Sequence, residues 1–525
     1  MSVVVIAVLV LPLAAAAVTA VTRGRDPRLT GQLGAGATGV GFVLSVALAV
    51  RVAGHSEVSA VLTNGAGALV VGVSVDRLTV VLLLLVYVIG TVAQAFAVRY
   101  LHGDPRAGWF SVSACLLTAV TGAMVTSTTL VGMAACWTVG GVALCLLLST
   151  YSHVPAARLG VTRTVTALVI GDFALWGAVA MVTARVGTVE LRELGAALQG
   201  QSAVFIGAAA ALVVVAALSR SAQIPFHRWL PATLAAPTPV SALLHAGVVN
   251  GGGMLLVRNG YLVGQSGFAM VLAAVAGGLT AVYGTAAMLA KPDVKGALVY
   301  STTAQMGFMM LTCGVGLYGA AVFHLVAHGM YKATLFLNSG AAVARRAHAS
   351  RWAPAPEITA RTRFGLLAAA LLLPALALTA ALLIVPQSAA EHGSGAVLLV
   401  FGWATAAAAT AGWLRRRHSP FALITVSATL VAAAAGYRVL VAGFTGFIDP
   451  ALPPTTAPQV AVWAVVIAAV ALAVLAVLRK TPTGGRVGSL HRSVYVAALS
   501  AGHVSVPHRP LREATISLSV RGAHQ

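Results

Sequence analysis

The feature that most constrains this chain is a series of about fifteen apolar runs, most of them about twenty residues long. A helix of about twenty apolar residues crosses the hydrocarbon core of a bilayer. Only 9% of the 525 residues are charged, against about 25% in ordinary globular domains. We therefore predict an all-α fold, a polytopic membrane helical bundle of about 13–15 transmembrane helices. The expected spans are 3–21, 34–53, 76–98, 110–128, 130–150, 162–184, 202–219, 238–257, 268–289, 297–316, 318–340, 363–386, 396–413, 420–443 and 459–478.

The net charge of +21 is explained by where the basic residues lie. If the N-terminus is outside and each span crosses once, most lysines and arginines fall in loops on one side, together with the C-terminal tail. Such an excess marks the cytoplasmic side of a membrane protein. We therefore expect a multi-pass protein of the cell inner membrane, in contact with the lipid bilayer and not with nucleic acid. The loops on that side hold Arg23, Arg25, Arg28, Arg99, Arg106, Arg158, Arg163, Arg220, Arg228, Lys291, Lys295, Arg345, Arg346, Arg351, Arg415, Arg416 and Arg417.

Several smaller features complete this expectation. The first span lacks a basic leader and is long enough to cross, so we expect a membrane helix and not a cleaved signal peptide. The Gly/Val/Ser-rich loop from Gly54 to Val75 is expected to form a short hairpin. The four cysteines lie in apolar spans without the spacing of metal ligands, so they are expected to be small buried hydrophobic residues. We therefore expect no metal site and no cofactor in this chain.

Three titratable residues share one face of the span 318–340. In "FHLVAHGMYKATLFLNSG", His324, His328 and Lys332 follow one another at intervals of four. Because a helix turns about 100° per residue, they form a polar stripe with one residue per turn. Histidine titrates near neutral pH, and burial shifts the pKa of lysine. The stripe is therefore typical of a hydrated proton relay, and the alternative is a structural polar seam between helices.

Three further ionisable residues lie in or at the ends of spans, where each needs a partner or a function. His245 lies between two prolines and three glycines, a pattern that predicts a broken helix. We favour a proton-relay role for it over that of a hydrogen-bonded core histidine. Asp172 is either a charge that tunes a titratable neighbour or a carboxylate satisfied by Arg163 or Arg220. Arg220 ends a span, where an arginine often extends its charge to the interface. The alternative is a functional role, and we count Arg220 and Asp172 among the expected proton-relay residues.

Three long motifs, in this order along the chain, carry a family resemblance. They are "SAQIPFHRWLPATLAAPTPVSALLHAG" (Ser221–Gly247), "DVKGALVYSTTAQMGFMML" (Asp293–Leu311) and the stripe segment above. They resemble the antiporter-like proton-translocating subunits of respiratory complex I and of multisubunit sodium/proton antiporters. By this resemblance Arg220 takes the place of a family lysine and Asp172 that of a family acid. His245, His324, His328 and Lys332 match family positions.

Other segments resemble one branch of that superfamily, the membrane (B) subunits of DAB inorganic carbon transporters. These segments are "VDRLTVVLLLLVYVIG", "RYLHGDPRAGWF", "LLHAGVVNGGGMLLVR" and "VYVAALSAGHVSVPHRP". The resemblance implies a proton-conducting subunit of an energy-coupled pump for CO2 or bicarbonate. It also implies a separate cytoplasmic A subunit (DabA), similar to a β-carbonic anhydrase, that carries zinc.

Two departures from complex I favour this branch. Complex I subunits have a glutamate after the tryptophan of their fifth helix, whereas Thr138 follows Trp137 here. They also carry an essential lysine or glutamate in a second half-channel. The last four expected spans of this chain contain no lysine or carboxylate, and Arg438 lies inside one of them. A complete two-half channel of the complex I type is therefore not expected.

The resemblance also implies a division into four parts. We expect N-terminal helices and an external loop in residues 1–75, a proton-translocating antiporter-like core in 76–345, C-terminal helices in 346–478 and a basic cytoplasmic tail in 479–525. The alternatives that remain are a subunit of NADH-quinone oxidoreductase or a related hydrogenase, a subunit of a sodium/proton antiporter, and a non-transporting scaffold. We expect a transporter subunit and not an enzyme.

Overall fold

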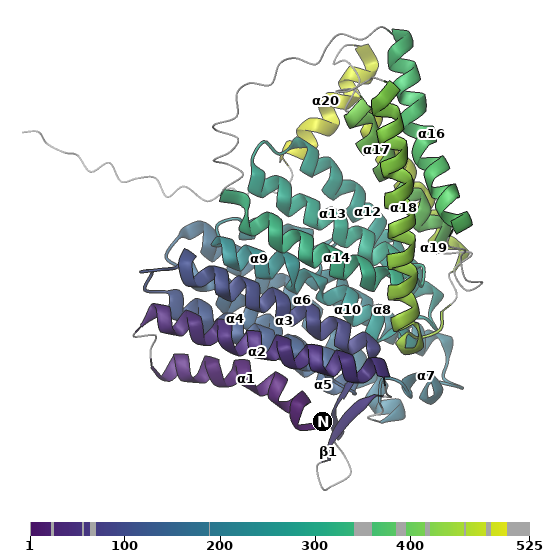
Figure 1. Ribbon diagram of the computed structural model, residues 1–525. Helices are drawn as coiled ribbons and strands as arrows, with labels where there is room; N and C mark the ends of the chain where they lie inside the picture. The colour runs from purple at the N-terminus through teal and green to yellow at the C-terminus, as the bar shows by residue number, and fades with distance from the viewer. Residues whose placement is uncertain are drawn as a thin grey trace, which may run out of the picture.

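The apolar runs form helices in the computed structural model, which describes residues 2–22, 26–54, 57–63, 70–187, 190–340, 360–384, 395–414, 420–455, 458–478 and 485–500. Each of the expected spans falls on a helical segment of this described part (Figure 1). Twelve segments are long and apolar enough to cross a membrane. The remaining three spans correspond to α13, α17 and α19. The chain is therefore an all-α, multi-pass membrane bundle.

The longer helices are α1 (Ser2–Val21), α2 (Pro27–Gly54), α3 (Arg77–Tyr100), α4 (Ala107–Thr126), α5 (Leu130–Leu148), α6 (Pro155–Val186), α8 (Ala203–Arg220), α9 (Thr238–Ala246), α10 (Gly251–Arg258), α12 (Gly267–Ala290), α13 (Val294–Gly314), α14 (Tyr318–Leu337), α16 (Ala360–Ile384), α17 (Gly395–Leu414), α18 (Pro420–Ile448), α19 (Gln459–Leu478) and α20 (Gly485–Ser500). Short elements are α7 (Leu194–Ala197), α11 (Gly260–Val263) and the 3-10 turns η1 (Ser149–Tyr151), η2 (Phe226–Arg228), η3 (Pro231–Thr233), η4 (Val248–Asn250) and η6 (Asp449–Ala451).

Two helices begin earlier than the apolar runs indicate. The spans expected at 34 and 162 begin at Pro27 and Pro155. Proline suits the first turn of a helix because its fixed φ is already helical and its missing N–H would have no partner there. Before α2, the Asp26 carboxylate accepts the backbone N–H of Arg28. A prediction based on the length of an apolar run misses a first helical turn that is made of polar residues.

A β-hairpin occupies the loop between α2 and α3, as the sequence predicts. Strands β1 (Val58–Thr63) and β2 (Val70–Val75) pair antiparallel, with Val58 opposite Val75. Ser127, in the turn between α4 and α5, bridges Val73, and Glu190 bridges Thr129. The hairpin is therefore joined to the turn between α4 and α5, and this turn also pairs with the segment that follows α6.

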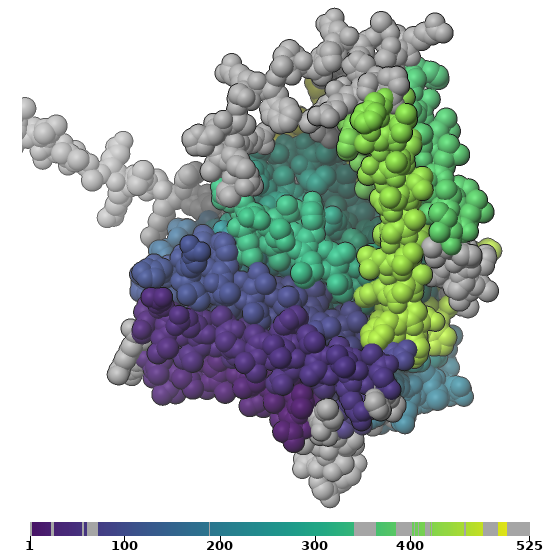
Figure 2. Space-filling view, in the orientation of Figure 1, coloured from purple at the N-terminus to yellow at the C-terminus, as the bar shows by residue number. Residues whose placement is uncertain are grey.

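The first helices pack into the layer drawn in purple and blue in Figures 1 and 2. Helix α2 lies along α3, and α1 lies along α4. The Tyr87 hydroxyl of α3 donates a hydrogen bond of 2.5 Å to the Val8 carbonyl of α1. A large hydrophobic core of buried leucine, valine and alanine side chains continues from this layer through α14.

Helices α12 and α13 meet along a seam of glycines. A Cβ at Gly307 would lie 2.4 Å from the backbone nitrogen of Ala281, and a Cβ at Gly277 would lie 2.5 Å from that of Leu311. Only glycine permits backbones to approach this closely, which is a common way of packing helices in membranes. The seam positions α13 on α12, and α13 also packs on α14, where it supplies polar groups to the site described below.

One membrane crossing is interrupted, as the pattern of prolines and glycines predicts. Helix α9 follows Pro237 and ends at Ala246, the turn η4 follows, and α10 continues to Arg258. The glycines after the break allow close packing, because a Cβ at Gly252 would lie 2.4 Å from the Ala217 carbonyl of α8. The break thus lies in the core of the bundle, between α8, α13 and α14.

The C-terminal helices stand at one side of the body (Figure 2). Helix α16 packs on α17 and α18, and α18 contacts α14 through Phe323, which meets the rings of Tyr437 and Phe444 edge-on. Helix α19 packs on α12. In the tail, α20 also lies on α12, where Lys291 donates to the Leu499 carbonyl at 2.8 Å. Residues 501–510 of the tail motif lie outside the described residues.

Candidate functional site

The predicted polar stripe lies on α14 and faces the interior of the bundle. His328 and Lys332 are 3% and 1% exposed, and His324 is partly buried. The rings of His324 and His328 are nearly parallel, with centroids 5.9 Å apart and an interplanar angle of 9°. The spacing of four residues therefore produces the stack of rings that helix geometry predicts.

Lys332 is held by neutral groups from α13. Its Nζ donates to Ser301 Oγ at 2.5 Å and to the Leu298 carbonyl at 3.4 Å. None of the ion pairs in the described part of the chain includes this lysine. A proton can therefore be held or released here without separating an ion pair, whereas a carboxylate partner would tie the charge in place.

The broken helix brings His245 to the same place. Its ring stacks on Phe336, with centroids 4.3 Å apart and 7° between the planes. Phe336 lies one turn beyond Lys332 on α14, so it continues the stripe. Helix α9, which carries His245, packs directly on α14. The stripe and His245 thus form one cluster, which we call the stripe cluster.

Arg220 and Asp172 form a second cluster. The Arg220 side chain is 5% exposed, so its guanidinium turns into the bundle and does not extend to the interface. It donates to the Trp137 carbonyl at 2.8 Å and lies 4.0 Å from the centre of the Trp137 ring. Asp172 Oδ1 is 3.8 Å from Arg220 Nη2. Of the two arginines considered for Asp172, Arg220 is the ion-pair partner in the structure.

Neighbouring residues of the helix break connect the two clusters. Asn250 approaches His328, with Oδ1 3.4 Å from Nδ1. A Cβ on the next residue, Gly251, would lie 3.3 Å from Arg220 Cγ. Ser221, which follows Arg220, donates to the Val249 carbonyl at 2.6 Å. The backbone freed by the break is thus satisfied by polar groups, as a membrane interior requires.

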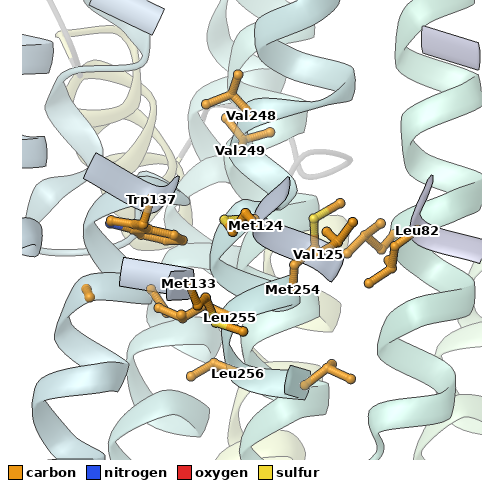
Figure 3. Packing of buried hydrophobic residues seen from close by; sticks show 14 of the residues in the cluster. Leu82, Met124, Val125, Met133, Trp137, Val248, Val249, Met254, Leu255 and Leu256 are labelled. Atoms are coloured by element: carbon orange, nitrogen blue, oxygen red, sulfur yellow. The ribbon is translucent and has the colours of Figure 1, made fainter. Parts of the chain in front are cut away.

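An apolar layer surrounds the helix beyond the break. Figure 3 shows Met254 and Leu255 of α10 among Trp137, Met133 and the α4 residue Met124. These side chains are 6% exposed or less. Apolar side chains offer water few hydrogen-bond partners, so this layer disfavours a continuous chain of water. The polar clusters are therefore bounded on the α10 side by packed hydrophobic residues.

An ion-pair network fixes the far end of α10. Arg258 donates to the Ser127 carbonyl at 2.6 Å and lies 3.8 Å from Asp76 Oδ2. Arg192 donates to the same Asp76 oxygen at 2.8 Å and also pairs with Glu57. Asp76 itself caps α3. This network ties α10, α3, the hairpin and the loop before α8 together at one end of the bundle.

The structure thus divides the six sequence-predicted residues between two clusters, and it adds residues that the sequence analysis missed. Ser301 and Asn250 contact the stripe, and the Trp137 ring contacts Arg220. The Thr138 hydroxyl, at the position of the absent glutamate, accepts the indole N–H of Trp176 at 3.0 Å. A signal for Asn250 was present, since it is a polar residue at a predicted helix break. Ser301 carries no such signal.

Comparison with known proteins agrees with this fold. Residues 127–382 match the family model described as NADH:quinone oxidoreductase/Mrp antiporter, TM, and residues 62–111 match the complex I chain 5 N-terminus. Together these matches cover more than half of the chain. The chain therefore contains the antiporter-like membrane domain that complex I and Mrp antiporters share.

The chain is also similar to two probable inorganic carbon transporter subunits of Halothiobacillus neapolitanus (strain ATCC 23641 / c2). It is 38% identical to DabB2 over 53% of this chain and 51% of DabB2. It is 34% identical to DabB1 over 63% of this chain and 62% of DabB1. The chain thus spans less than two thirds of the length of these relatives.

A solved structure supports the fold over nearly the whole chain. The Mrp complex from Dietzia sp. DQ12-45-1b contains a chain that superposes with a TM-score of 0.64 and 24% identity. The superposition covers 96% of this chain and 60% of that one. The similarity between these two structures lies in the arrangement of their helices.

Proposed function

We propose that this chain is the membrane subunit of an energy-coupled inorganic carbon pump and that it conducts protons inward. The single observation that carries the proposal is the stripe cluster. Three titratable groups follow one another at one-turn intervals, of which His328 and Lys332 are buried and His324 is partly buried, and Lys332 is bonded to neutral acceptors. Ionisable residues are rare inside membranes and mark proton relays in pumps and transporters. The similarity to probable carbon transporter subunits supports the choice of cargo.

In this mechanism Lys332, His328 and His324 pass a proton along α14 through intervening water. His245 lies beside the broken helix, on Phe336, and gives the path a branch toward α9. Asp172 pairs with the Arg220 guanidinium. The pair places a permanent positive charge next to the helix break, and the carboxylate neutralises that charge in the core. Proton flow would drive directional hydration of CO2, or bicarbonate accumulation, in a bound partner.

The partner in this proposal is a cytoplasmic, zinc-containing, carbonic-anhydrase-like A subunit (DabA). It would dock on the side of the basic loops, which we place in the cytoplasm by the positive-inside rule. The membrane would be the cell inner membrane, with the N-terminus outside. This chain would then be a transporter subunit, and chemistry on carbon would belong to the partner.

The test is uptake of labelled inorganic carbon by carbonic-anhydrase-deficient cells. The cells express this chain alone, or together with the candidate A subunit, with and without a protonophore. We expect uptake that requires both chains and that the protonophore abolishes. Absence of uptake, despite co-purification of both chains, would contradict the carbon pump.

The family model also names complex I and Mrp antiporters, so the second candidate is an ion-translocating subunit of that kind. Sodium-dependent proton exchange in vesicles would favour an antiporter, and co-purification with quinone-reacting subunits would favour the oxidoreductase. Thr138, which stands where complex I has a glutamate, favours the carbon pump over the oxidoreductase.

A further inference from the structure

Asn250 lies at the helix break with both ends of its amide engaged. The side chain is fully buried, at 0% exposure. Its Nδ2 donates to the Ala246 carbonyl at 2.7 Å. Its Oδ1 lies 3.4 Å from Nδ1 of His328. The amide thus joins the backbone freed by the break to the second histidine of the stripe.

The Ala246 bond determines which way the amide faces. A carbonyl oxygen accepts hydrogen bonds and cannot donate them, so only the NH2 end of the amide fits against Ala246. The oxygen end is therefore the one that faces His328. An amide oxygen is an acceptor, so the ring nitrogen opposite it must carry a hydrogen. The neutral His328 ring is then protonated at Nδ1 and has its lone pair at Nε2.

The other nitrogen of this ring is consistent with that assignment. His328 Nε2 is buried and has no hydrogen-bond partner among the described residues. The same holds for His324 Nε2. Both histidines therefore have a buried Nε2 without a hydrogen-bond partner among the described residues. Two stacked rings with the same nitrogen unoccupied suit a proton that passes along α14.

We propose that Asn250 is a positioning residue that fixes the tautomer of His328, so that Nε2 is the nitrogen that takes up the relayed proton. This inference rests on the proposed function for its transport consequence, but the tautomer itself can be measured without transport. A partner that fixes the tautomer and orientation of histidine is a recurrent requirement of proton transfer and metal binding. The distance of 3.4 Å is long, as such bonds often are in resting structures.

The chain offers a matched control for the structural part of this role. Asn259 is also buried, at 1% exposure, and its Nδ2 donates to the carbonyl four residues earlier, Leu255, at 2.9 Å. Its amide also contacts the Met133 sulfur, and among the described residues no histidine is its hydrogen-bond partner. Asn250→Leu and Asn259→Leu therefore remove the same kind of bond from the same crossing. Only the first removes a histidine partner.

The experiment reads the tautomer by nitrogen-15 NMR of histidine-labelled full-length protein. The His328 signal is assigned by its loss in His328→Gln. We expect Nδ1–H in the wild type and in Asn259→Leu, and a mixture or the Nε2–H form in Asn250→Leu. Asn250→Asp should retain Nδ1–H, because its carboxyl group still offers an acceptor. The Asn250→Asp variant keeps the test decisive if Asn250→Leu does not fold.

Proton flux into vesicles is measured on the same proteins. Asn250→Leu should lower the flux about tenfold or more, since a misplaced acid–base group loses most of its contribution. Asn250→Asp should conduct better than Asn250→Leu, and Asn259→Leu should match the wild type. An Nε2–H wild-type ring, or equal flux losses in both leucine variants, would overturn the inference. The predicted tautomers without proton flux in the wild type would overturn the proposed function and leave the assignment of Asn250 supported.

Discussion

At the scale of single residues, the two clusters differ in the groups that surround their buried cation. Lys332 is bonded to a hydroxyl and a carbonyl, whereas Arg220 has a carboxylate, a carbonyl and an aromatic ring around it. A lysine with neutral partners can change its protonation, whereas an arginine stays protonated in proteins. We therefore assign proton transfer to the stripe cluster and a fixed positive charge to Arg220.

The Arg220–Asp172 pair gives a prediction at this scale. Asp172→Asn should destabilise the solubilised protein by about 1–3 kcal/mol, because it leaves a buried guanidinium without its counter-charge. Arg220→Gln alone should also destabilise it, since Asp172 then lacks its partner. The double variant should lose clearly less than the two single losses combined. The measurement is a double-mutant cycle of thermal unfolding in detergent, and strictly additive losses would show that the pair has no energetic coupling.

At the scale of helices, close packing controls where the polar groups lie. The glycine seam between α12 and α13 fixes α13, and α13 supplies Ser301 to Lys332. The break between α9 and α10 places Asn250 and Gly251 between the two clusters. The geometry of the site thus depends on backbone positions that only small residues allow.

The seam gives a second prediction. In Gly307→Ala the new Cβ would lie 2.4 Å from the Ala281 nitrogen, a backbone atom that cannot turn aside. We expect a loss of about 1–3 kcal/mol, seen as a lower melting temperature, together with reduced proton flux. The control is Gly36→Ala in α2, where nothing lies within 4 Å of the new Cβ. It should melt at or slightly above the wild-type temperature. Equal melting temperatures for both variants would contradict the role of the seam.

The same elements show what the sequence can and cannot predict. Length and apolar character predict the helices, and the spacing of four predicts the histidine stack, because both are local properties of one helix. The hairpin and the helix break are also local, and both predictions are confirmed. The contacts of Asp172 with Arg220 and of Lys332 with Ser301 join separate helices. Local periodicity carries no information about contacts between separate helices. The sequence therefore did not predict which residues form these pairs.

At the scale of the whole molecule, polar groups lie in layers along the bundle. The ion-pair network of Arg192, Arg258 and Asp76 lies at one end of the bundle. The apolar layer around α10 follows (Figure 3), and the two clusters lie at the helix break. The basic loops belong to the other ends of these helices. By the orientation proposed above, the network faces outward and the clusters connect to the cytoplasmic half.

This orientation gives a third prediction. In a background without the four native cysteines, His102→Cys and Gln199→Cys place single thiols at exposed positions in loops at opposite ends of the bundle. A membrane-impermeant maleimide added to intact spheroplasts should label position 199. It should label position 102 only after the membrane is broken. Labelling of position 102 in intact spheroplasts, with position 199 protected, would invert the orientation and the proposed docking side.

The central claim is that protons pass through Lys332. The most direct test is acidification of right-side-out vesicles that contain this chain with its candidate A subunit and a trapped pH-sensitive dye, after an acid pulse outside. We predict rapid acidification with the wild type and none above empty vesicles with Lys332→Ala, at equal amounts of inserted protein. A protonophore should restore acidification in the Lys332→Ala vesicles, which shows that they are sealed. Acidification by Lys332→Ala at the wild-type rate would contradict the account.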